Sequence, residues 1–279
     1  MTIALDRRVL LAFGAGGALA PFLALGDAAA QEGIDHAANA AHAGFGAISD
    51  FQMTGREQIA MLLYPGFTAL DLVGPHYMFA CMMGATVHLV TTERNLRPVA
   101  SDLGLAIAPT TTMRGCPEAL DILFVPGGTQ GTLDVMRNEA ALAFIRNRAA
   151  QSRHVTSVCT GSLILGKAGL LAGKRATSHW VTRDILSVFG ATPVNARVVT
   201  DGAVTTGAGV SAGLDFGLAL LAALRGANYA RAIQLQAEYA PAPGFDAGTP
   251  ETAPEGVSAA MRTLFAPFAE AALQAARPR

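Results

Sequence analysis

Cys159 lies where the sequence changes from a strand pattern to a helix pattern. It follows the segment 154–158, which we interpret as a short buried strand, and comes just before the helical pattern that begins at Gly161. A sharp strand-to-helix turn lifts a side chain out of the sheet and directs it toward the free N–H groups of the helix. The positive end of the helix dipole favours a thiolate. Free cysteines are also among the most buried residues, so this stretch alone predicts either a nucleophile or a structural thiol.

Asp71 is the only formally charged residue between Glu57 and Glu93, and it follows a strand-like apolar run. One interpretation is a helix cap, which is a common role for aspartate. The other is a functional acid. Beside a thiolate in a dry site, burial and the like charge would both raise the pKa of Asp71. The neutral carboxyl group could then donate a hydrogen bond to sulfur or a proton to a substrate.

Gly127 and Gly128 follow another buried run, residues 121–125. Paired glycines allow backbone N–H groups to turn toward a ligand, as in an oxyanion hole, although a plain tight turn has the same composition. The N–H of Thr160, directly after the cysteine, would be the second donor. The Thr160 hydroxyl is predicted to reach a substrate or a water, or else to cap the helix.

His179 ends a short extended segment, residues 176–179, and precedes Trp180. An imidazole there could approach Cys159 as a base or as a cation. The alternative is a packed histidine with no chemical role.

Strand-length apolar runs alternate with helical patterns through most of the chain. This alternation predicts an α/β fold, in which a mostly parallel sheet lies between two helical layers. Ligands meet such sheets at the carboxyl ends of the strands, where the loops of Asp71, Gly127 and Cys159 begin. A hairpin-like insertion is expected over residues 98–107 and a tight turn at Asp201-Gly202. The expected strands cover 59–64, 86–92, 121–125 and 154–158, and the expected helices cover 68–82, 138–151, 180–189, 209–224 and 229–239.

The first thirty residues have the composition of an export signal. Arg7 and Arg8 precede the apolar run 9–25, and small residues end the segment at Ala30. This pattern is typical of a bacterial twin-arginine signal. An uncleaved anchor is the alternative, but the run is shorter than the ~20 residues that span a bilayer, and Pro21 interrupts it. We therefore expect a cleaved signal over 1–30, a periplasmic protein with no membrane association after cleavage, a linker over 31–55, a folded domain over 56–240, and a C-terminal loop and helix over 241–279.

Composition excludes several classes of protein. The 279 residues carry a net charge of −1 with no run of Lys or Arg, so no nucleic-acid partner is expected. The three cysteines, Cys81, Cys116 and Cys159, form no C-x-x-C pair, and no histidines have zinc spacing, so no structural metal is expected. We expect Cys159 to be a free thiol, whereas a Cys81–Cys116 disulfide is neither predicted nor excluded.

Several motifs, in this order, resemble those of the DJ-1/PfpI superfamily and, within it, of the isonitrile hydratase-like subfamily. The resemblance covers about residues 58–250 and includes the tail 233–239. It rests on Tyr64-Pro65-Gly66-Phe67 with an acid shortly after, Pro126-Gly127-Gly128, Val158-Cys159-Thr160-Gly161 and Ala176-Thr177-Ser178-His179-Trp180.

The resemblance implies a flavodoxin-like three-layer sandwich, usually a homodimer, with Cys159 on a nucleophile elbow. It implies a hydratase that adds water to an isonitrile, gives an N-substituted formamide and needs no cofactor. Asp71 would be the acid near Cys159, and Thr160 would help to place the reacting groups. Protease-like members carry His after the cysteine, so Thr160 argues against a peptidase. AraC-type regulators share two motifs but carry a DNA-binding pattern that we do not find after residue 225.

Two alternatives remain open at this point. One is another DJ-1-like activity, such as a glyoxalase or a small-molecule hydrolase. The other is a non-catalytic periplasmic protein that binds a ligand or senses oxidants through Cys159.

Overall fold

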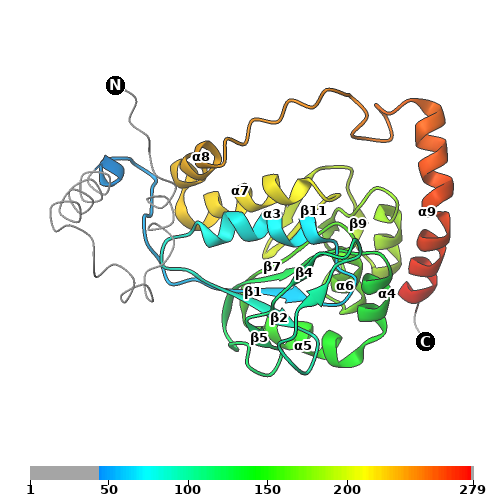
Figure 1. Ribbon diagram of the computed structural model, residues 1–279, viewed down its shortest axis with the longest axis horizontal. Coiled ribbons are helices and arrows are strands. Elements are labelled where there is room, and N and C mark those ends of the chain that lie inside the picture. Colours follow the sequence, from blue (N-terminus) through cyan, green and yellow to red (C-terminus); the bar gives the residue numbers. More distant parts are fainter. Residues whose placement is uncertain (1–43, 278–279) are drawn as a thin grey trace.

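A seven-stranded sheet forms the centre of the protein in the computed structural model, which describes residues 44–277 (Figure 1). The strand order is β10-β11-β7-β6-β1-β2-β5, and all neighbouring pairs are parallel except β10 and β11. The predicted signal segment 1–30 lies outside the described residues. The strands are β1 (Gln58–Leu63), β2 (Thr86–Thr91), β5 (Thr111–Thr112), β6 (Leu120–Val125), β7 (Ser152–Val158), β10 (Val198–Asp201) and β11 (Val204–Gly207).

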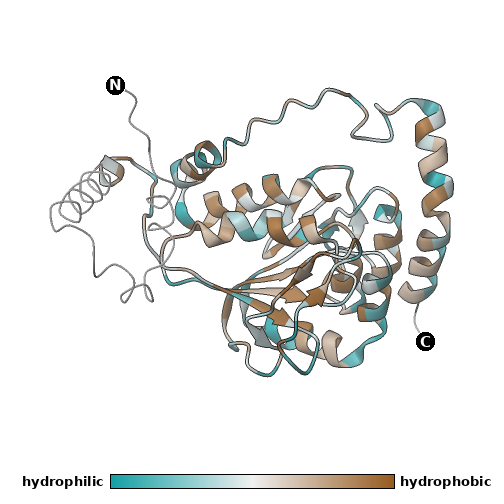
Figure 2. Cartoon of the chain, viewed as in Figure 1, coloured by the Kyte–Doolittle hydropathy of each residue, from teal (hydrophilic) through white to brown (hydrophobic). Residues whose placement is uncertain are grey.

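Helices cover both faces of this sheet, so the predicted three-layer α/β sandwich is confirmed. The first layer contains α3 (Ala69–Ala80), α7 (Ala212–Arg225) and α8 (Ala227–Gln236). The second contains α4 (Gln130–Arg137), α5 (Glu139–Ala149), α6 (Gly161–Lys167) and α9 (Glu255–Ala276). Figure 2 shows apolar residues along the strands and on the inward faces of the helices. Strands covered on both faces are apolar throughout, and five of the six residues of β1 are buried.

Small residues let the first helical layer pack closely. A methyl group on Gly213 would lie 3.0 Å from Cδ of Pro75, and one on Gly217 would lie 2.6 Å from Cγ of Met78. Helix α7 therefore approaches α3 at backbone distance. The glycine-rich stretch from residue 207 is the strand-to-helix turn between β11 and α7.

The smaller elements agree with the sequence patterns in part. The expected insertion is an antiparallel pair, β3 (Val99–Ala100) with β4 (Ala106–Ile107), and the Asp201-Gly202 turn joins β10 to β11. The expected helix 180–189 is instead the 3₁₀ helix η1 (Arg183–Phe189), which lies between the two strands of a short parallel pair, β8 (Arg175–Ala176) and β9 (Thr192–Pro193). Helix α4 and strand β5 were not predicted.

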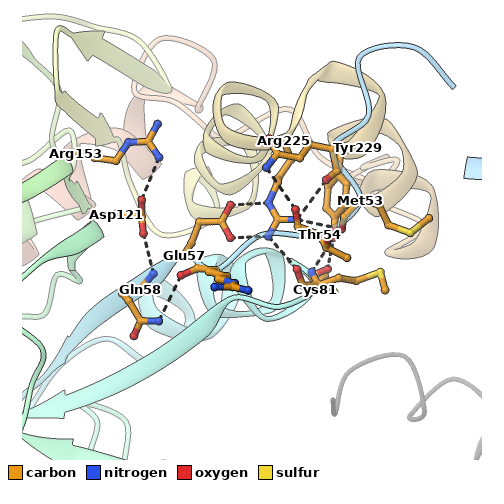
Figure 3. A network of polar contacts seen from close by, with 12 residues as sticks. Met53, Thr54, Glu57, Gln58, Cys81, Asp121, Arg153, Arg225 and Tyr229 are labelled. Carbon is orange, nitrogen blue, oxygen red and sulfur yellow. Dashed lines mark hydrogen bonds and ion pairs between the residues drawn. The ribbon is translucent and has the colours of Figure 1, made fainter. Parts of the chain in front are cut away.

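The segment before β1 is fastened to the domain by a buried ion pair (Figure 3). The Arg225 guanidinium makes two hydrogen bonds to the Glu57 carboxylate, at 2.6 and 2.5 Å. It also donates to the carbonyls of Gln52, Met53 and Met83. Part of the segment assigned to the linker, from Ser49 to Gly55, is therefore in contact with α7 and α8, to which Asp50 and Ser49 also bond.

After α8 the chain runs as an extended strap, residues 238–254, before α9 packs against α4, α6 and η1. The strap is mostly exposed, but Glu251 accepts a hydrogen bond from Asn195 at 3.3 Å. The end of α9 is held by Lys167, which donates to the carbonyls of Ala276 and Arg277. Within residues 44–277, no helix combines the length and apolarity needed to cross a bilayer.

Candidate active site

The nucleophile elbow is a left-handed turn centred on Cys159. Its φ of 58° is unusual for a residue other than glycine, and such conformations persist only where the surroundings impose them. The Cys159 N–H donates to the carbonyls of Gly207 and Ala208, at 3.1 and 2.7 Å. The hydroxyls of Ser162 and Ser178 both donate to the Cys159 carbonyl at 3.1 Å. Four hydrogen bonds thus hold the backbone of Cys159 in its left-handed conformation.

Asp71 is a buried acid and does not cap its helix. Its side chain is 0 % exposed in the first turn of α3, and Oδ2 accepts a hydrogen bond from the Gly127 N–H at 3.0 Å. The N-terminal residue of the helix is Thr68, which makes no side-chain cap bond. Oδ1 has no hydrogen-bond partner of good geometry. The capping interpretation is therefore excluded, because the carboxyl group bonds to a loop 56 residues away.

The paired glycines do not form an oxyanion hole. The Gly127 N–H is used by Asp71, and the Gly128 N–H donates to Oγ1 of Thr160 at 2.9 Å. Thr160 Oγ1 in turn donates to the Gly128 carbonyl at 2.7 Å and lies 2.9 Å from Oγ1 of Thr132. Of the two interpretations, the structure favours a turn over oxyanion donors for Gly127 and Gly128, and the Thr160 hydroxyl bonds to this turn and to Thr132. The loop instead joins the acid to the elbow.

The sulfur of Cys159 lies near Asp71 and two backbone N–H groups. Burial raises the pKa of the Cys159 thiol well above its usual value, and the Asp71 charge raises it further. Hydrogen bonds from the N–H groups of Thr160 and Val210 act in the opposite direction. Burial therefore outweighs these two hydrogen bonds and favours the protonated thiol. The role of Val210 was not predicted, because any residue type can supply a backbone N–H donor and the sequence therefore gives no sign of it.

Burial also raises the pKa of Asp71 to about 7, against the lowering effect of hydrogen bonds with Cys159 and the Gly127 N–H. The pKa of Asp71 is therefore raised, as the sequence analysis predicted for a buried acid beside Cys159. With the acid poised near neutral pH beside a protonated sulfur, the pair can exchange one proton.

His179 does not lie against the thiol. No hydrogen bond joins it to Cys159 among residues 44–277, and its ring contacts the rings of Trp180 and Phe265, with centroids 5.6 and 5.9 Å away. Burial lowers the pKa of His179 to about 4, so the imidazole is neutral near pH 7. This favours the packed, neutral histidine over the cation, of the alternatives that the sequence left open. Its neighbour Ser178 is the residue that contacts the elbow.

A pocket of about 590 Å³ lies beside the elbow. Leu70, which precedes Asp71, and Val210, whose N–H reaches the sulfur, both line it. Its wall also includes His179, Trp180, Arg183 and the strap residues 248–250. Cys159 itself is only 5 % exposed and does not line the pocket, so the pocket is adjacent to the sulfur and does not include it.

The described residues offer no metal centre, because no three His, Cys, Asp or Glu side chains are grouped within 44–277. All three cysteines are free thiols in the structure. Cys81 ends α3, and Cys116 lies before β6 and is buried, so the disulfide that the sequence left open is not formed.

The protein is thus an α/β sandwich of the class that carries a cysteine on a strained strand-to-helix turn, here beside a buried acid. The model of the DJ-1/PfpI family matches residues 57–223, and the chain belongs to this family.

Three proteins of known name or structure are similar to this chain. It is 52% identical to an isonitrile hydratase from Pseudomonas putida, over 75% of this chain and 90% of that one. A crystal structure of a ThiJ/PfpI family protein from Pseudomonas syringae matches with a TM-score of 0.80 and 53% identity, over 82% of this chain and 93% of the other. A deglycase from Pyrococcus horikoshii is 30% identical over 49% of this chain and 80% of its own.

Proposed function

We propose that this protein is a cysteine-dependent hydratase that adds water to an isonitrile and releases an N-substituted formamide. The observation that carries the proposal is the buried carboxyl group of Asp71, which has a pKa of about 7 and lies beside the Cys159 thiol. The 52% identity to the Pseudomonas putida isonitrile hydratase, over 90% of that protein, supports it.

The burial of the sulfur and of the acid favours this substrate class. Cys159 is 5 % exposed, and Asp71 is fully buried. An isonitrile, R–N≡C, ends in a single carbon with no substituents, so its reactive atom can enter an opening that would exclude a branched carbonyl carbon. The substituent R would extend into the pocket beyond Leu70 and Val210.

In the first half of the reaction, the Asp71 carboxylate accepts the thiol proton as the sulfur attacks the terminal carbon. A C–S bond forms, and Asp71 passes the proton to the same carbon, which gives a thioimidate, R–N=CH–S, on Cys159. The N–H groups of Thr160 and Val210 stabilise the negative charge on sulfur during this transfer.

In the second half, the Asp71 carboxylate takes a proton from water as the water oxygen adds to the thioimidate carbon. The nitrogen receives that proton. The C–S bond then breaks, the hydroxyl proton returns to sulfur through Asp71, and R–NH–CHO leaves. Atoms and electrons balance with one isonitrile and one water, and no step uses the Thr160 hydroxyl, which is already bonded to the Gly128 backbone.

The sensor alternative receives less support from the geometry. Redox-sensing cysteines have a low pKa and are accessible to solvent. Cys159 is buried, and its thiol pKa is raised.

The experiment is the incubation of purified protein with cyclohexyl isocyanide, followed by chromatographic detection of N-cyclohexylformamide. The wild-type chain should form the formamide, and Cys159→Ala should not. Cys116→Ala is the matched control, because it removes another buried free thiol distant from the elbow in sequence. Formamide production by Cys159→Ala at the wild-type rate would contradict the mechanism.

We also propose that the protein is exported by its twin-arginine segment to the periplasm, where the segment is cleaved, and that it acts there as a homodimer. Arg7 and Arg8 before the apolar run support the export route. Replacing both arginines by lysine should leave the precursor in the cytoplasmic fraction, whereas normal export of that variant would contradict the proposal. Light scattering of the mature protein should give twice the monomer mass.

A further inference from the structure

The wall of the pocket beside the elbow contains an arginine that makes no direct ion pair among residues 44–277. Arg183 begins η1, is half-buried and lines the pocket. Its Nη1 donates to Oδ1 of Asn195 at 2.7 Å, and within residues 44–277 it makes no ion pair. A guanidinium carries five N–H donors, so a single amide oxygen leaves most of them free for a ligand.

The other charges around this pocket are already engaged. Arg197 also lines it, but its guanidinium is paired with Asp215, which accepts a further hydrogen bond from Tyr239. Glu251, on the strap, bonds to the Asn195 amide at 3.3 Å. A backbone hydrogen bond and, more weakly, the nearby guanidinium charge of Arg183 lower the Glu251 pKa, but the Glu251 and Arg183 side chains are not in direct contact. Arg183 is therefore the charged group on this wall that is not neutralised by direct contact.

The same pocket adjoins the reacting atoms. Leu70 precedes Asp71 in α3, and Val210 donates its N–H toward the sulfur. A volume of about 590 Å³ lies in the range of pockets that bind drug-sized ligands, roughly 300–1,000 Å³. It exceeds the need of a small ring substituent. A longer substituent attached to a carbon at Cys159 would lie along this wall.

We infer that the substrate is an isonitrile whose substituent ends in an anionic group, such as a carboxylate, and that Arg183 binds that group. Arg183 is thus a specificity-determining residue, held in place by Asn195. This inference rests on the proposed function for the reaction itself, but the binding of a carboxylate in the pocket can be measured without any turnover.

The test compares two substrates of equal length, a terminal isocyanopentanoate and its uncharged methyl ester. The wild-type chain should have a kcat/KM for the carboxylate about 10- to 100-fold above that for the ester, the range expected of a charge-assisted hydrogen bond. In Arg183→Met this ratio should fall to about one. Arg183→Lys, which keeps the charge but loses the planar fork, should give an intermediate ratio.

Arg231→Met is the matched control. Arg231 is exposed on α8 and also donates to an asparagine at 2.7 Å, but it does not line the pocket. Its variant should keep the wild-type ratio. An equal loss of the ratio in both variants, or a wild-type enzyme that hydrates the two substrates equally well, would overturn the inference.

A binding measurement separates failure of this inference from failure of the proposed function. If neither isonitrile is hydrated, the proposed reaction is wrong, and calorimetric titration with unreactive pentanoate decides on Arg183. Saturable binding to the wild-type chain that is lost in Arg183→Met and kept in Arg231→Met would support the carboxylate site. Absence of binding to the wild-type chain, or binding that Arg183→Met retains, would overturn it.

Discussion

The Asp71 carboxyl group accepts a 3.0 Å hydrogen bond from the Gly127 N–H, which ties the acid on α3 to the loop that follows β6. The next residue of that loop bonds to Thr160 through both its N–H and its carbonyl. The acid and the elbow are therefore held by one loop. This arrangement allows a proton to move between sulfur and carboxyl without either group having to move far.

Replacing the acid should abolish most of the activity. Asp71→Asn preserves the size of the side chain but cannot accept the thiol proton, so hydration of cyclohexyl isocyanide should slow by roughly 100- to 10,000-fold, the usual range for a general acid–base. Because the Asp71 pKa is about 7, wild-type kcat/KM should rise with pH through this value, and the variant should lack that rise. Asp102→Asn, an exposed acid nearby that bonds to Thr68, should keep it. A wild-type profile that is flat between pH 5 and 9 would refute the assignment.

The same acid should make stability depend on pH. Burial raises the pKa of Asp71 from 3.8 to about 7, so the folded state holds its proton more tightly than the unfolded state. The stabilising contribution is complete below pH 3.8 and is lost as the pH rises to about 7. At about 1.4 kcal/mol for each unit of the shift, its total is on the order of 4 kcal/mol. Urea unfolding followed by circular dichroism between pH 4 and 8 should show this loss for wild type and not for Asp71→Asn. If the free energy of unfolding depended on pH in the same way for both proteins, the contribution of Asp71 would be refuted.

Gly127 should not tolerate a side chain. An added methyl group would lie 2.6 Å from Oδ2 of Asp71 and 2.7 Å from the Thr160 nitrogen, so one of the two must move. Gly127→Ala should lower kcat at least about 10-fold, since small misplacements of reacting groups are costly, and should destabilise the fold by about 1–3 kcal/mol. The control is Gly244→Ala on the strap, where a methyl group meets nothing within 4 Å. Equal activity of the two variants would show that the loop does not position the acid.

The ion pair before β1 should contribute strongly to stability. Arg225 and Glu57 are 1 % and 7 % exposed, so Arg225→Met leaves a buried carboxylate without its partner. The expected cost is about 3–5 kcal/mol in the free energy of unfolding, measured in urea. Arg153→Met breaks the exposed pair with Asp121 and should cost less than about 1 kcal/mol. The double variant Glu57→Met/Arg225→Met should recover part of the loss, and a further loss would contradict this explanation.

The sequence predicted those strands and helices that can be identified from the order of residues within one short segment. Strands covered on both faces are continuous apolar runs, so β1, β6 and the site of Cys159 were found from composition and order. Asp71 was found because a single charge in a long apolar segment is conspicuous. Helix α4 was missed because its eight residues follow directly on the glycine loop and show little apolar content.

Contacts between distant segments could not be predicted in this way. The pairing of Thr160 with Gly128, the approach of the Val210 N–H to sulfur and the contact of Phe265 with His179 depend on how loops meet in space. The Glu57–Arg225 pair joins residues 168 positions apart, and charge alone did not identify it. For the same reason the docked segment before β1 was assigned to a linker.

That separation of 168 positions also determines when the domain can be completed during synthesis. A ribosome releases Glu57 long before it has made Arg225, and the partners of β7 on its outer side, β11 and then β10, are also made late. A nascent chain that stops short of Arg225 holds the Glu57 carboxylate without its counterion, and one that stops short of β10 also leaves the outer edge of β7 unpaired. Folding of this protein is therefore completed only after almost the whole domain has left the ribosome, and any transport of the folded form must follow translation.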